Sequence, residues 1–78
     1  MRIRKPTLFF SFPTTSAAMK AEITCREAGI PGRLVPIPGE ITAGCGLAWM
    51  SEPDQETGIR AFFDARGLEY ENSYILEF

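Results

Sequence analysis

The sequence predicts one domain of the α+β class, in which two helices pack on one face of a four-stranded antiparallel sheet. Its 78 residues suit a single domain, so residues 1–78 are treated as one unit. Strand-like and helix-like patterns follow one another in the order strand, helix, strand, strand, helix, strand. Two βαβ-like halves of this length are typical of the ferredoxin-like βαββαβ two-layer sandwich, whose first and third strands are central.

The first predicted strand, residues 7–12, is dense in aromatic side chains. Leu8, Phe10 and Phe12 share one face because side chains alternate with period two along a strand. Phe9 points to the opposite face, which indicates a central strand. We expect that second face of the sheet to be exposed and to favour a partner or a dimer.

The first helix should run from hydroxyl N-cap candidates at residues 14–16 to about Ala28. One stripe of small residues at helical spacing should face the sheet, and it consists of Ala17, Ala18, Ala21, Cys25 and Ala28. Met19 and Ile23 fall outside this stripe and should form a small exposed patch. Gly29 is the candidate residue for ending the helix.

A short second strand is predicted over residues 33–36. Because Pro36 and Pro38 cannot donate hydrogen bonds to a ladder, this strand should lie at an edge of the sheet. A loop rich in small residues follows and leads into a third strand over residues 47–50. The cysteine of this loop, Cys45, should therefore lie in the connection between the second and third strands.

The second helix should begin near residues 51–54, where a proline and acidic residues suit a helix start. Ile59, Phe62 and Phe63 have the i, i+3, i+4 spacing of a core face. We expect Ile59 and Phe62 to pack between the sheet and the first helix. Gly67 is the candidate C-terminal residue, and a last strand should finish at residues 74–78.

The composition limits the classes of partner. The net charge is −2 with no long run of one sign, so the chain lacks the electrostatic footprint of a nucleic-acid or anionic-membrane binder. No apolar run approaches the roughly 20 residues of a membrane helix. Two cysteines are too few for a secreted disulfide scaffold, which favours a cytoplasmic protein with reduced thiols.

The available catalytic chemistry is narrow. The chain has no histidine, which excludes Cys–His and Ser–His nucleophile pairs. No four-ligand zinc pattern and no phosphate-binding glycine motif is present, so neither a metal nor a cofactor is expected. The remaining chemistry is that of the thiols. Cys25 lies on the alanine stripe and should be buried.

Cys45 has a different context, because Gly44 and Gly46 flank it in the loop. Glycine neighbours leave a sulfur atom approachable, and nearby backbone N–H groups could stabilise an anionic sulfur species. Glu40 is the nearest acid in the loop, although a single loop acid is usually solvated. The alternative interpretation is that the glycines shape a turn and that Cys45 is a small apolar residue beneath it.

Several short segments together resemble a known family: Lys20-Ala21-Glu22, Ala28-Gly29-Ile30-Pro31, Arg33-Leu34-Val35-Pro36, Glu40-Ile41 and Cys45-Gly46-Leu47-Ala48. The chain resembles the small family of selenium/sulfur carrier protein-like proteins. The resemblance implies a cytoplasmic prokaryotic protein that handles reactive sulfur or selenium, with Cys45 as the matching cysteine. The chain departs from the family pattern at Gly39, where a basic residue is expected, and at Ala43-Gly44, where hydroxyl residues are expected.

The leading hypothesis is a non-enzymatic thiol carrier that holds a persulfide-type species on Cys45, flanked by Gly44, Gly46 and Glu40 as binding residues. Its partners would be donor and acceptor proteins, and a homodimer is an open alternative. The second hypothesis is an interaction module that uses the exposed sheet face, with Cys45 structural. A metal-trafficking domain is the weakest candidate, because soft metals are normally carried by paired thiolates.

Overall fold

The computed structural model describes residues 4–41 and 44–78. The elements follow in the order β1 (Pro6–Ser11), α1 (Thr15–Ala28), β2 (Arg33–Pro36), β3 (Leu47–Ser51), η1 (Pro53–Gln55), α2 (Glu56–Arg66) and β4 (Ser73–Glu77). This βαββαβ order confirms the predicted α+β, ferredoxin-like class. None of the helices in the described part of the chain is long and apolar enough to cross a membrane.

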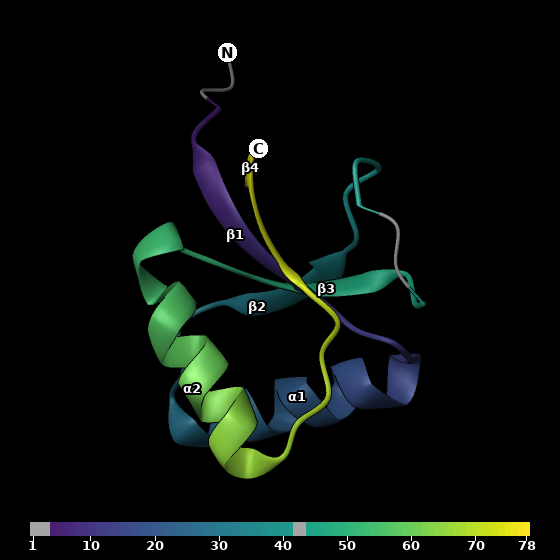
Figure 1. The fold of residues 1–78 in the computed structure, drawn as a ribbon, viewed down its shortest axis with the longest axis vertical. Helices are drawn as coiled ribbons and strands as arrows, with labels where there is room; N and C mark the ends of the chain where they lie inside the picture. The colour runs from purple at the N-terminus through teal and green to yellow at the C-terminus, as the bar shows by residue number, and fades with distance from the viewer. Residues whose placement is uncertain (1–3, 42–43) are drawn as a thin grey trace.

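The four strands form one antiparallel sheet in the order β2-β3-β1-β4. β1 and β3 are central and β2 and β4 are the edges, as predicted. In the register, Phe10 lies opposite Trp49 on β3, and Leu8 lies opposite Ile75 on β4. Figure 1 shows α1 and α2 on the same side of this sheet.

The ends of α1 follow from its sequence. The Thr14 hydroxyl accepts a hydrogen bond from the Ala17 N–H at 3.0 Å, which satisfies one of the unpaired donors of the first turn. At the other end, Gly29 takes a left-handed conformation with φ 70° and closes the helix. Met19 and Ile23 are exposed, as predicted, whereas Ala28 is also exposed and does not belong to the buried stripe. The stripe ends at Cys25 because Ala28 is the last residue of the helix.

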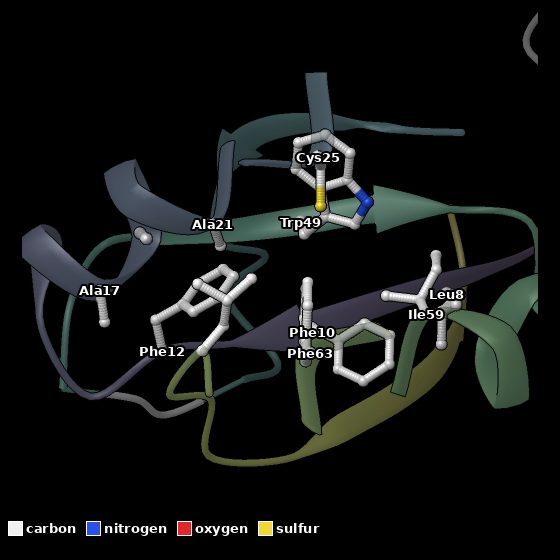
Figure 2. Packing of buried hydrophobic residues seen from close by; sticks show 11 residues of the cluster. Leu8, Phe10, Phe12, Ala17, Ala21, Cys25, Trp49, Ile59 and Phe63 are labelled. Carbon is white, nitrogen blue, oxygen red and sulfur yellow. The ribbon is translucent and has the colours of Figure 1, made fainter. Parts of the chain in front are cut away.

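The main core lies between the sheet and both helices, and Figure 2 shows its side chains converging from β1, β3, α1 and α2. Phe10 meets Phe63 edge to face with ring centroids 5.1 Å apart. Ile59 and Ala21 lie in this core as predicted, but Phe62 does not lie at its centre. Phe62 is only partly buried, because the fully buried aromatic residue of α2 is its neighbour Phe63.

The face of the sheet opposite the helices differs from the prediction. Phe9 has no exposed surface, so the centre of this face is closed. The cover comes from the β2–β3 connection, whose Ile41 packs with Phe9 and Ala48 in a second buried cluster. Phe78 adds an edge-to-face ring contact to Phe9 at 5.4 Å. The sequence pattern could not show this cover, since a loop without regular periodicity provides it.

Replacing Phe63 with alanine should lower the free energy of unfolding by about 3–5 kcal/mol, because it empties a fully buried ring site. Phe62→Ala should cost clearly less, since that ring is partly exposed and lies under the Arg66 guanidinium at 4.8 Å. Urea denaturation of both variants measures the difference. Equal losses would contradict this assignment of the buried face of α2.

Candidate functional site

The two cysteines are in different environments. Cys25 has no exposed surface, and its side chain points from α1 toward Trp49 in the main core (Figure 2). Burial raises the pKa of the Cys25 thiol from 9.0 to about 11, because an apolar environment disfavours the thiolate. At neutral pH this sulfur is therefore protonated and shielded. Both cysteines are free thiols.

Cys45 lies in the β2–β3 connection, two residues before β3 begins. Its side chain is half-buried and packs against the edge of the main core. The Sγ atom lies 3.5 Å from the Leu47 carbonyl oxygen, to which the thiol donates. Both flanking residues are exposed. The sulfur is thus held at the border between core and solvent, which combines features of the two interpretations that the sequence left open.

Gly44 fixes this loop against the start of the chain. A Cβ atom at Gly44 would overlap the Pro13 carbonyl, so only glycine allows the backbone to approach the β1–α1 connection this closely. The Gly44 N–H also donates to the Glu71 carboxylate at 3.3 Å. This donor was expected to be available to an anionic sulfur. In the structure it is instead bound to Glu71.

Gly46 is held through its other backbone group, because its carbonyl accepts a hydrogen bond from the Ile37 N–H at 2.9 Å. Within residues 4–41 and 44–78, the N–H groups of Cys45 and Gly46 have no hydrogen-bond partner. Of the loop N–H groups that were predicted to stabilise an anionic sulfur, these two remain free. Ala43, one of the departures from the family pattern, lies outside the described residues.

The structure does not connect Glu40 with Cys45. Glu40 is exposed in the turn that the Ile41 N–H closes on the Pro38 carbonyl at 3.0 Å. Its carboxylate has no ion pair or hydrogen bond to any described residue. Ile41, by contrast, is buried beneath the sheet. Glu40 is thus a solvated acid at the start of the loop, whereas its neighbour anchors the loop.

Pro13 and Glu71 are the two residues of the site that the sequence did not indicate. Both are far from Cys45 along the chain, and no motif or periodicity connects them to the loop. Glu71 reaches Gly44 because the segment before β4 returns beside the end of β1, where the Glu71 N–H donates to the Ser11 carbonyl at 2.7 Å. Among the described residues, no group of three or more metal-binding side chains is present.

Gly44→Ala should lower the free energy of unfolding by about 1–3 kcal/mol, because the new methyl group would overlap the Pro13 carbonyl. Gly46→Ala is the matched control, since a Cβ atom there meets nothing within 4 Å. Neither glycine has a positive φ, so the comparison isolates the contact from backbone strain. Similar thermal and urea unfolding of the two variants would contradict the close approach.

Glu71→Ala should speed hydrogen exchange at the Gly44 amide and alkylation of Cys45. The substitution removes the acceptor that holds the loop at Gly44, one residue before Cys45. Glu69→Ala is the control, because Glu69 is an exposed acid on the same segment without a hydrogen bond to a described residue. NMR exchange and timed alkylation measure the two effects. An unchanged Gly44 exchange rate in Glu71→Ala would show that the carboxylate does not hold the loop.

Comparison with known proteins assigns the chain to a family. Residues 7–75 match the sequence pattern of the family described as Putative Se/S carrier protein-like. No curated protein and no solved structure matches the chain. The family match begins in β1, includes the Cys45 loop and ends in β4. Since it spans most of the sequence, the protein belongs to this selenium/sulfur carrier-like family.

Proposed function

We propose that this protein carries sulfur or selenium as a persulfide-type species on Cys45 and passes it to a partner protein. The observation that supports this most is the contrast between the thiols. Cys25 is enclosed in the core, whereas Cys45 is only half-buried, on a loop held at Gly44 and Gly46. Family membership supports sulfur or selenium as the cargo, and the position of Cys45 supports its sulfur as the atom that would hold it.

The loading step is a thiol exchange. The Cys45 thiolate attacks the outer sulfur of a persulfide on the donor protein. A new S–S bond forms at Cys45 Sγ, the S–S bond of the donor breaks, and the donor sulfur leaves as a thiolate with the bonding electron pair. Delivery repeats the same exchange with a thiolate of the acceptor. Selenium follows the same scheme with selenium as the outer atom, so no external oxidant or reductant enters.

This exchange requires little from the chain itself. The outer atom of the cargo is the one transferred, and donor and acceptor proteins can supply the proton transfers. The carrier must keep one thiol accessible and the other unreactive. The free N–H groups of Cys45 and Gly46 would stabilise the anionic form of the cargo. Such a protein is a non-enzymatic carrier, and a reducing cytoplasm would keep its thiols free.

The alternative function, an interaction module, would need a different surface from the one that the sequence predicted. Its expected surface, the sheet face that carries Phe9, is closed at the centre by the β2–β3 connection. An apolar surface is instead exposed on α1, where the side chains of Met19 and Ile23 are 52% and 53% exposed. Under the carrier proposal this patch is a candidate contact for a donor or acceptor.

Alkylation of the native protein at neutral pH should modify Cys45 well before Cys25. The Cys25 thiol is buried with its pKa raised to about 11, so both access and thiolate fraction limit its reaction. Peptide mapping by mass spectrometry after timed alkylation measures the order. Denatured protein, in which both thiols are exposed, is the control. Equal rates in the native state would argue against the assignment of the two cysteines.

Incubation with a cysteine desulfurase and cysteine should add one sulfur atom to the chain, which intact-mass measurement detects. Cys45→Ser should abolish this addition while keeping the circular dichroism spectrum of the fold. Cys25→Ala is the matched variant and should still load. Loading that survives Cys45→Ser, or that is lost only in Cys25→Ala with the fold intact, would overturn the carrier proposal.

A further inference from the structure

We infer that the free edge of β4 pairs with β4 of a second copy of this chain, which joins the two sheets across a two-fold axis. The inference concerns a surface that the carrier proposal does not use. It rests on three features of the described residues: an unprotected strand edge, the direction of its backbone groups, and a register in which the strand complements itself.

The two edges of the sheet differ in protection. β2 ends at Pro36 and is followed by Pro38, residues that block the addition of a further strand. β4 contains no proline and carries one charge, at Glu77. Its middle residue, Ile75, is 49% exposed although it is apolar. β4 is therefore the edge at which another strand can add.

Two backbone hydrogen bonds between Lys5 and Phe78 fix which backbone groups of β4 face outward. The Phe78 N–H donates to the Lys5 carbonyl at 3.1 Å, and the Lys5 N–H donates to the Phe78 carbonyl at 3.4 Å. In an antiparallel pair, hydrogen-bonded and non-hydrogen-bonded positions alternate. This alternation directs the N–H and C=O groups of three residues away from β1: Ser73, Ile75 and Glu77.

A two-fold axis through Ile75 uses all three of these residues. Ile75 then lies opposite Ile75 of the second copy, and Ser73 lies opposite Glu77 of the second copy. Each such pair can exchange two backbone hydrogen bonds. No charged residue faces a like charge across the axis, and apolar Ile75 side chains meet at the centre. The two-fold operation also closes the assembly at two copies.

In the same register, a carboxylate of the second copy comes close to a guanidinium group. The Ser73 hydroxyl donates to the Glu56 carboxylate, and Arg60 contacts the same hydroxyl and forms an ion pair with Glu56 at 3.0 Å. Residues directly opposite in an antiparallel pair place their side chains on the same face. Glu77 of the second copy would therefore extend beside Ser73 toward the Arg60 guanidinium, whose five N–H donors it would share with Glu56.

The β4 edge is separate from the proposed thiol site, since it includes none of residues 44–46. Edge pairing between two short strands buries a small area, so the dimer should be weak and depend on concentration. Failure of the chain to dimerise and failure of Cys45 to load sulfur are thus measured independently.

Sedimentation of the full chain from about 10 µM to about 1 mM should show a shift from the monomer mass of 8.7 kDa toward twice that mass. Ile75→Lys should remain monomeric throughout, because it places two positive charges opposite each other at the axis. Ile23→Lys is the matched control, with a similarly exposed isoleucine on α1, and should dimerise like the natural chain. Circular dichroism verifies that both variants keep the fold.

Amide exchange tests the register. In the natural chain at high concentration, the amides of Ser73, Ile75 and Glu77 should exchange several-fold more slowly than on dilution, and this protection should be absent in Ile75→Lys. A chain that stays monomeric at about 1 mM, or a dimer in which these amides gain no protection, would overturn the inference.

Discussion

The burial of β1 on both of its faces is the constraint on which the rest of the structure depends. Leu8, Phe9 and Phe10 have no exposed surface, although successive side chains of a strand point in opposite directions. One face is covered by two helices, and the other requires a separate cover. The long β2–β3 connection provides that cover through Ile41.

This arrangement links the proposed site to both cores. The start of the connection packs on the second cluster through Ile37 and Ile41, and its end packs on the main core through Cys45. The connection therefore passes from one face of the sheet to the other, and Gly44 contacts Pro13 on the way. Because the loop is held on both faces of the sheet, the position of the Cys45 sulfur depends on these tertiary contacts as well as on the local turn.

Most of the fold could be predicted from the sequence because its signals are local. Alternation along β1, the capping residues Thr14 and Gly29, and the prolines around β2 each act on neighbouring residues, and the structure confirms them. The predictions were wrong where a local sequence pattern allowed more than one packing arrangement. Spacing alone could not decide whether Phe62 or Phe63 occupies the centre of the core, since that depends on the angle at which α2 lies on the sheet.

The site was predicted less completely than the fold, for a physical reason. The contrast between Cys25 and Cys45 follows from local context, since one lies on an apolar helix stripe and the other between two glycines. The Gly44 contacts are tertiary, and they appear only when the segment before β4 returns beside β1 and brings Glu71 to the loop. The sequence suggested that Gly44 supplies a free N–H group, but in the structure Gly44 positions the loop.

The polar contact at the Cys45 loop acts on its backbone. A catalytic thiol is normally activated by a base or a cation close to the sulfur. Here the polar group that reaches the loop is a carboxylate, and it binds a backbone N–H group next to the cysteine. The Glu71 carboxylate thus holds the backbone that carries the thiol. Under the proposed carrier role, this positioning would present the Cys45 sulfur to a partner protein in one orientation.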